Sequence, residues 1–164
     1  MRIPALIVGF GNISQGFASV LSRKAQYLRE TLGIEISVIG VVEVVNGRFE
    51  SAFLKDGLDL DGLLRTKRQA GRVSAYPGAG GNSPTLELIR DSGARIMLEA
   101  TPTNIKDGEP GLSHIRTALD AGMHVVTSNK GPLLFGLREL RNLARAKGVE
   151  FRYSAAVAGA LPVI

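Results

Sequence analysis

The stretch Ile3-Pro4-Ala5-Leu6-Ile7-Val8-Gly9-Phe10-Gly11-Asn12-Ile13-Ser14 decides the fold of this chain. Its first half is an apolar run that predicts a buried strand, and apolar residues recur at helical spacing from Ile13 to about Glu30. Two glycines lie at the junction: Gly9 allows a tight turn, and Gly11 lets a ligand approach the backbone closely. The helix N-terminus behind them is a place for the pyrophosphate of a dinucleotide. The segment therefore predicts the strand–turn–helix unit that opens a dinucleotide-binding fold.

Strand and helix signals alternate along the rest of the chain. Further strands are predicted over residues 36–42, 94–98, 124–127 and 149–153, and further helices over residues 59–69, 84–90, 111–121 and 132–147. Residues 71–84 are rich in Gly, Ser and Pro and predict a plain connecting loop. Alternation of this kind implies right-handed crossovers. We expect an α/β fold with a Rossmann-type, doubly wound, mainly parallel sheet and helices on both faces.

The composition fits one compact domain of 164 residues, 45% of them hydrophobic. No stretch approaches the roughly 18 consecutive apolar residues of a membrane span, so no membrane contact is expected. The net charge is +5, but the basic residues are scattered and only residues 65–68 form a basic cluster. The six Phe and three Tyr do not interleave with basic residues, so no nucleic-acid partner is expected. Without cysteine the chain has neither disulfides nor thiolate metal sites, and a cytoplasmic location is the default expectation.

The glycine fingerprint departs from its usual form at one position. In Gly9-x-Gly11-x-x-Ser14 a serine takes the place of the third glycine, which normally lets helix and strand pack closely. Glu43 ends the second predicted strand, where a carboxylate accepts hydrogen bonds from the ribose hydroxyls of NAD. Arg48 and Lys55 follow closely and could neutralise the 2′-phosphate of NADP instead. The sequence is therefore compatible with either NAD or NADP as the cofactor.

A second polar loop, Thr127-Ser128-Asn129-Lys130-Gly131-Pro132, carries the strongest chemical signal. Lys130 follows a strand and precedes a helix that begins with proline, and loops at this edge of an open α/β sheet bind ligands. A cation there can hydrogen-bond a carbonyl or hydroxyl oxygen as hydride moves. Thr101 follows another strand and faces the same crevice. The alternatives are a solvated surface lysine and a simple turn, and His114 and His124 are interpreted as structural.

Several segments together resemble the homoserine dehydrogenases. They are Lys55-Asp56-Gly57-Leu58-Asp59-Leu60, Glu99-Ala100-Thr101-Pro102-Thr103-Asn104, Asp107-Gly108-Glu109-Pro110-Gly111, Val125-Val126-Thr127-Ser128-Asn129-Lys130-Gly131-Pro132 and Val157-Ala158-Gly159-Ala160-Leu161-Pro162. The resemblance implies an enzyme that interconverts L-homoserine and L-aspartate 4-semialdehyde with NADP or NAD, on the route to threonine, methionine and isoleucine. It implies an NAD(P)-binding Rossmann domain over residues 1–154. Residues 155–164, which end on an apolar run, would then begin a catalytic and dimerisation domain that is missing from this chain.

The resemblance also implies roles for individual residues. Phe10, Asn12 and Ile13 would line the dinucleotide beside the two glycines, Thr101 would approach its nicotinamide end, Ser128 would also bind the cofactor, and Lys130 would be catalytic. A monovalent cation, usually sodium, would be held by carbonyls of the segment that includes Ser154, Val157, Gly159 and Leu161, although Ser154 stands where the family commonly has glutamate.

The family's second lysine and its substrate-binding acids belong to the catalytic domain. We therefore expect this chain to bind cofactor without turnover, and the intact enzyme to be a homodimer that acts on a small-molecule substrate. Two other readings remain open from the sequence. One is a non-catalytic NAD(P)-binding module that regulates a partner. The other is a related dehydrogenase that acts on a different amino-acid-derived carbonyl.

Overall fold

The structure, a computed structural model, describes residues 1–156. Its strands are β1 (Arg2–Val8), β2 (Glu35–Val45), β3 (Arg48–Phe53), β4 (Gly80–Gly81), β5 (Ile96–Glu99), β6 (His124–Thr127) and β7 (Phe151–Arg152). Its α-helices are α1 (Asn12–Leu32), α2 (Leu60–Ala70), α3 (Thr85–Asp91), α4 (Gly111–Asp120) and α5 (Gly131–Lys147), and short 3₁₀ turns are η1 (Val73–Ala75) and η2 (Ser154–Ala156).

All seven strands form one sheet in the order β4-β3-β2-β1-β5-β6-β7. The pairs β1–β2, β1–β5, β5–β6 and β6–β7 are parallel, whereas β2–β3 and β3–β4 are antiparallel. The chain starts at β1 in the middle, builds one half of the sheet, and then crosses to β5 on the other side of β1. The point where strand order reverses lies between β1 and β5, and ligands bind outside the carboxyl ends of the strands at such a point. The predicted mainly parallel Rossmann-type sheet is confirmed.

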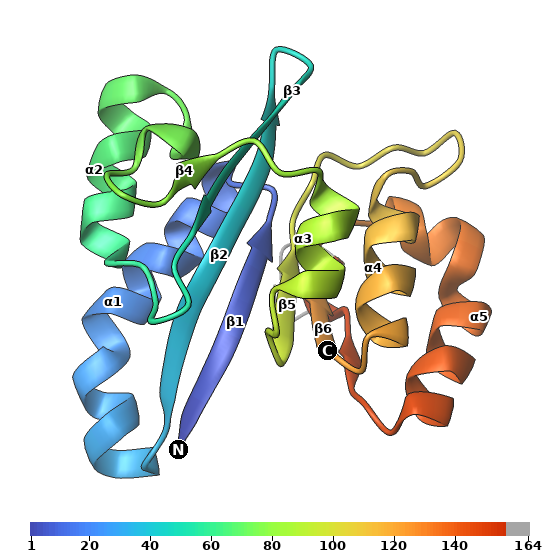
Figure 1. Ribbon diagram of the computed structural model, residues 1–164. Helices are drawn as coiled ribbons and strands as arrows, with labels where there is room; N and C mark the ends of the chain where they lie inside the picture. The colour runs from blue at the N-terminus through green and yellow to red at the C-terminus, as the bar shows by residue number, and fades with distance from the viewer. Residues whose placement is uncertain (157–164) are drawn as a thin grey trace.

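Helices cover both faces of the sheet, as Figure 1 shows, with α1 and α2 on one side and α3, α4 and α5 on the other. Because side chains alternate along a strand, β1 supplies both cores. Ile7 packs toward α1 and α2, while Leu6 and Val8 pack toward the other three helices. The register between β1 and β2 shifts at Ala5/Leu6, and the alternation of β2 side chains between the two faces of the sheet shifts with it. Burial on both faces is the reason that β1 and the middle of β2 are almost continuously apolar.

Local sequence signals set the helix ends. Asp59 caps α2 by accepting hydrogen bonds from the backbone N–H groups of Asp61 and Gly62. α1 ends at Gly33 and α5 at Gly148, both in the left-handed conformation that favours glycine. Each α-helix begins and ends close to its predicted bounds. Among residues 1–156 there is no helix with both the length and the apolar character needed to cross a bilayer.

The edge beyond β2 differs from the prediction. β2 continues past residue 42 to Val45, and Asn46-Gly47, with φ of 51° and 75°, turns the chain into the antiparallel strand β3. The prediction that residues 71–84 are only a loop is also wrong, because they include η1 and the short strand β4. β4 completes the sheet edge by pairing with β3, about 30 residues earlier in the chain. The short, mixed polar and apolar sequences of η1 and β4 carry no clear period.

Candidate functional site

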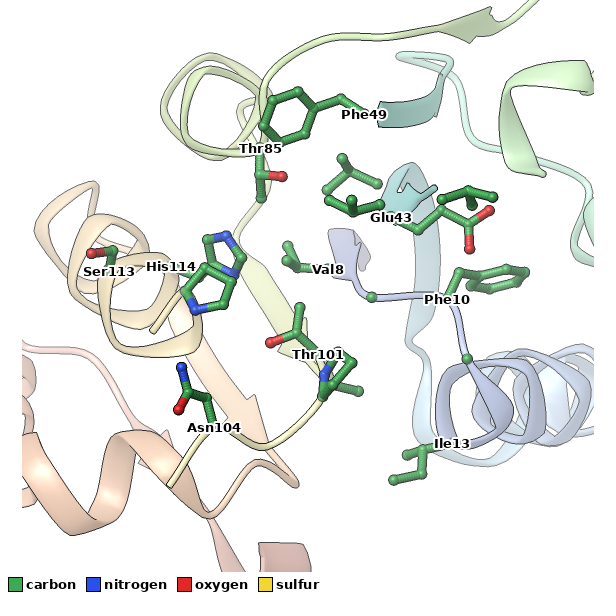
Figure 2. Close-up of a pocket in the computed structure, with 18 of the residues that line it drawn as sticks. Val8, Phe10, Ile13, Glu43, Phe49, Thr85, Thr101, Asn104, Ser113 and His114 are labelled. Atoms are coloured by element: carbon green, nitrogen blue, oxygen red, sulfur yellow. The ribbon is translucent and has the colours of Figure 1, made fainter. Parts of the chain in front are cut away.

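A cleft of about 1600 Å³ lies along the carboxyl ends of β1, β2, β5 and β6. Its wall is formed by the β1–α1 turn, the end of β2, the first turns of α3 and α4, and the loops that follow β5 and β6. Figure 2 shows side chains from these separate segments arranged around one space. The N-termini of four helices come to this edge because each helix in a crossover runs antiparallel to its strand. Of the residues predicted to bind cofactor, all but Arg48 and Lys55 line the cleft.

Gly9 and Gly11, the two glycines of the fingerprint, are needed for different structural reasons. Gly9 has φ of +86°, and a Cβ atom there would lie 2.7 Å from the carbonyl oxygen of Ala100 and 2.8 Å from the backbone nitrogen of Thr101. This close approach brings the β1–α1 turn against the loop after β5. Gly11 has an ordinary φ of −81°, and a Cβ atom would meet nothing within 4 Å. The open space at Gly11 is part of the cleft.

The N-terminus of α1 offers unpaired donors to this space. No side chain caps the helix, its first turn carries no acidic residue, and Gln15 donates to the carbonyl of Gly11. The backbone N–H groups of Asn12 and Ile13 therefore precede the first helical hydrogen bond. Such a helix end carries about half a positive charge and favours an anion. The replaced third glycine, Ser14, is fully buried at the foot of this turn without a clash, and its Oγ has no partner among the described residues.

Glu43 reaches the cleft as predicted, but not as a free strand end. It lies within β2 and is only 8% exposed, and the Nζ of Lys67 donates to its two oxygens at 2.8 and 2.6 Å. The backbone N–H of Val73 donates to Oε1 at 3.0 Å. Lys67 also lines the cleft, which the sequence analysis missed because the pairing spans two separate elements.

The fold places Arg48 outside the cleft lining. The Asn46-Gly47 turn makes Arg48 the first residue of β3, where it is exposed and outside the cleft lining. Lys55, the other cation proposed for a 2′-phosphate, is exposed after β3 and also does not line the cleft. Lys67 is the cation that β2 and α2 bring to this part of the cleft.

A buried polar network joins the loops after β5 and β6. Glu99 ends β5 and is fully buried, and its carboxylate accepts hydrogen bonds from the Thr101 backbone N–H at 3.0 Å and the Thr127 hydroxyl at 2.7 Å. The Thr101 hydroxyl also donates to it. The Asn129 side-chain amide donates to Glu99 at 3.4 Å and to the Thr101 hydroxyl at 3.2 Å, while its oxygen accepts from the Gly131 N–H. This network fixes the backbone on both sides of Lys130.

Glu99→Gln is expected to lower the free energy of unfolding by about 2 kcal/mol, because the new NH₂ group cannot accept from donors now paired with the carboxylate. Unfolding in urea, followed by circular dichroism, measures the loss. Glu150→Gln is the matched control, since Glu150 is exposed and its ion pair with Arg152 is on the surface. The control is expected to change stability by less than about 0.5 kcal/mol. Equal stability of the two variants would contradict a structural role for the Glu99 network.

Lys130 lies at the N-cap position of α5 and is exposed toward the cleft beside Ser128. None of the described residues forms an ion pair with its ammonium group. Gly131 permits this placement, since a Cβ atom there would lie 2.4 Å from the carbonyl oxygen of Asn104. The loop after β5 is itself braced by Asn104, whose amide donates to Asp107 and to the carbonyl of Glu109. The ammonium group is thus available to a ligand at the end of the cleft nearest β6.

The two histidines differ in their surroundings. His124 is structural, as predicted, since its Nδ1 accepts from the Glu150 backbone N–H at 3.1 Å. His114, also interpreted as structural, lines the cleft from the first turn of α4. It is 6% exposed, and burial lowers its pKa to about 4 against a smaller opposing effect of Glu109. The imidazole is therefore neutral at neutral pH. The sequence signal that could have placed His114 at the cleft is its position in the first turn of a helix that follows a strand and a loop.

The predicted monovalent-cation residues fall mostly outside the described part of the chain. Ser154 lies in η2, whereas Val157, Gly159 and Leu161 lie outside residues 1–156. Within the described residues no cluster of three or more His, Asp or Glu side chains is placed to hold a metal ion. Asp107 and Glu109 instead serve the loop and the entry to α4, where Glu109 accepts from the Ser113 N–H and hydroxyl.

Comparisons with known proteins agree with this geometry, although no family model matches the chain. The homoserine dehydrogenase of Methanocaldococcus jannaschii is 36% identical over 159 residues, which are 97% of this chain and 46% of that protein. The NAD(+)-dependent homoserine dehydrogenase of Pseudomonas canavaninivorans is 37% identical over 96% of this chain and 44% of its own length. A crystal structure from Archaeoglobus fulgidus, described as a homoserine dehydrogenase, superposes with a TM-score of 0.81 at 34% identity, covering 98% of this chain and 45% of that one. The chain thus spans about half the length of the relatives it matches.

Proposed function

We propose, for a chain homologous to the homoserine dehydrogenases over nearly its whole length, that residues 1–154 form the domain that binds NAD or NADP in such an enzyme. The observation that carries the proposal is the open, donor-lined space at Gly11. The backbone there admits a close ligand, and the uncapped end of α1 favours the negative charge of a pyrophosphate. The neighbouring walls of the cleft are long enough to hold both halves of a dinucleotide.

The reaction supported best is the interconversion of L-homoserine and L-aspartate 4-semialdehyde. The bound nicotinamide supplies or accepts the hydride. Lys130 lies at the cleft end near β6, where its ammonium group can donate a hydrogen bond to the oxygen of the alcohol or aldehyde. Ile13, in the first turn of α1, is an exposed apolar side chain that lines the cleft and offers a flat ring a packing surface. Holding the reactants together is the main contribution of such a domain.

NADH is expected to bind more tightly than NADPH, by about tenfold, or ~1.4 kcal/mol. The Glu43 carboxylate lines the cleft where the adenosine ribose would lie, and a 2′-phosphate bound there would meet its negative charge. Lys67 orients this carboxylate and partly offsets its charge, while Arg48 and Lys55 lie outside the cleft. The NAD(+)-dependent relative fits the same preference.

Fluorescence titrations of the purified chain with NADH and NADPH, side by side, test both proposals. Binding of neither dinucleotide would contradict the proposed function. If both dinucleotides bound and NADPH bound more tightly, the proposed function would hold but the role of Glu43 would be overturned. Lys67 would then bind the 2′-phosphate. Phe49→Ser is a companion variant, since Phe49 lines the cleft without a charge and its replacement is expected to weaken the binding of both dinucleotides equally.

Further features follow from the relationship alone and are proposed on that basis. The enzyme would be a cytoplasmic homodimer, which sedimentation of the active protein can test. A sodium ion would be held near the Ser154 carbonyl, since hard cations prefer oxygen ligands. Turnover that is the same in sodium as in tetramethylammonium salts of equal ionic strength would contradict the cation site.

A further inference from the structure

The hydrogen bonds around the Glu43 carboxylate leave one acceptor position open. Glu43 Oε1 accepts from Lys67 Nζ and from the Val73 backbone N–H, whereas Oε2 accepts from Lys67 Nζ alone. An ionised carboxylate has about four acceptor positions, shared equally between its oxygens. Within residues 1–156, Oε1 is thus filled by the protein, while a position on Oε2 stays open to a ligand in the cleft that Glu43 lines.

The ammonium group of Lys67 is already surrounded by acceptors. Its three N–H donors face three acceptors, which are the two Glu43 oxygens and the carbonyl oxygen of Gly71 at 2.8 Å. The side chain of Lys67 is also only 16% exposed. A phosphate group would have to displace one of these acceptors before it could receive a hydrogen bond from Lys67.

The position of the ammonium group is set by the end of α2. Lys67 lies in the last turn of this helix, where a cation is favoured by the helix dipole. Gly71, the left-handed C-cap, donates its N–H to the Lys67 carbonyl at 2.9 Å and accepts from Lys67 Nζ through its own carbonyl. The helix end therefore fixes the ammonium group independently of Glu43, and the carboxylate is held against a fixed partner.

Glu43 lies directly beside the turn that would hold the pyrophosphate. The Gly9 N–H donates to the Val42 carbonyl at 2.8 Å, so Glu43 follows the point at which β2 is joined to the turn after β1. Figure 2 shows Glu43 at the same end of the cleft as Phe10, the residue between the two fingerprint glycines. A dinucleotide with its pyrophosphate at Gly11 would bring the adenosine ribose to this side. The open position on Oε2 is the acceptor that a ribose hydroxyl would meet there.

We propose that Lys67 is a positioning residue that holds Glu43 so that Oε2 accepts the 2′-hydroxyl of the adenosine ribose, and that Lys67 itself does not bind a 2′-phosphate. This assignment rests on the proposed function. Without the ammonium group, the Glu43 carboxylate keeps only the Val73 N–H as a donor among the described residues. It would then have to be ordered when the ligand binds, which weakens its hydrogen bond to the ribose.

Lys67→Met tests the assignment, because methionine keeps an unbranched apolar stem and has no N–H donor. Isothermal titration calorimetry compares NADH with the NADH analogue that lacks the 2′-hydroxyl of the adenosine ribose. The unmodified protein is expected to bind NADH about tenfold more tightly than the analogue, which corresponds to one hydrogen bond to a charged group. Lys67→Met is expected to discriminate between them by less than about threefold. Partial unfolding would weaken both ligands alike and leave this ratio unchanged.

Two further variants complete the experiment. Lys67→Arg keeps a positive charge and N–H donors, and is expected to restore a discrimination of at least about fivefold. Arg68→Met is the matched control, because it removes a positive charge from the same turn of α2, where Arg68 is exposed and outside the cleft lining. Its discrimination is expected to equal that of the unmodified protein.

The possible failures are distinguishable. Full discrimination in Lys67→Met would overturn the assignment. If that variant kept the discrimination and lost NADPH affinity far more than NADH affinity, Lys67 would be a phosphate ligand, which also overturns it. An unmodified protein that binds NADH and the analogue equally would overturn the assignment and leave the proposed function in place. Failure of the unmodified protein to bind NADH would instead overturn the proposed function.

Discussion

Gly9→Ala is expected to destabilise the fold by about 4 kcal/mol or more and to lower NADH affinity at least a hundredfold. Gly9 has φ of +86°, which alanine adopts only with strain. The added Cβ would also lie within 2.8 Å of backbone atoms of Ala100 and Thr101, and backbone cannot move aside as a flexible side chain can. The turn would have to shift away from β5, and the N-terminus of α1 would shift with it. Urea unfolding and NADH titration of the same preparation measure both effects.

Gly11→Ala is the matched control for this turn. The conformation of Gly11 is open to any residue, and its Cβ would meet nothing within 4 Å, so stability is expected to change by less than about 0.5 kcal/mol. NADH affinity is nevertheless expected to fall about tenfold, because the methyl group occupies space that the pyrophosphate needs. A Gly11→Ala variant that binds NADH normally would show that the ligand does not approach the backbone at this point. A Gly9→Ala variant as stable as the unmodified chain would contradict the tight packing against β5.

Lys130→Ala is expected to lower kcat for homoserine oxidation about a hundredfold in an active enzyme that contains this chain. The ammonium group lies in the cleft without an ion-pair partner among the described residues, so its loss removes a donor from the ligand rather than from the fold. The dissociation constant for NADH is expected to rise by no more than about threefold, or ~0.7 kcal/mol. Steady-state kinetics and NADH titration separate the two quantities.

Lys106→Ala provides the comparison for the loss of a positive charge. Lys106 is exposed on the loop after β5, close in sequence to the cleft, but it does not line it. Its replacement is expected to leave kcat and NADH affinity unchanged. If Lys130→Ala behaved like Lys106→Ala, Lys130 would be a solvated surface lysine. If NADH affinity fell as strongly as kcat, Lys130 would bind cofactor without a separate role in the hydride step.

Local patterns predicted most of the cleft. The apolar run before Gly9, the helix behind Gly11 and the strand before Ser128 place their ends at one edge, because the carboxyl ends of parallel strands meet there. That rule alone brings Thr101 and Lys130 to the same cleft although they are far apart in the chain. The cap at Asp59 and the terminal glycines of the helices were also predictable, because each depends only on neighbours within a few residues.

The remaining features required the folded structure. The position of Arg48 outside the cleft lining was not predictable, because β3, a short strand with mixed polarity, pairs with β2 through a two-residue turn. Lys67 pairs with Glu43 because α2 packs beside the end of β2, and nothing within either segment specifies that contact. His114 was interpreted as structural because the sequence of a helix does not show which way a histidine side chain points or which residues it contacts.

Local sequence patterns predict the class of fold, the turn at Gly9 and Gly11, and the edge of the sheet at which a ligand would bind. These depend on backbone geometry and on periods within one element. The tertiary structure alone decided which charges meet in the cleft, which buried carboxylate supports the loop of Lys130, and which histidine lines the cleft. The physical reason is that hydrogen bonds and ion pairs between elements depend on the packing of side chains that are distant in the chain, and the local pattern of each element carries no record of its partner.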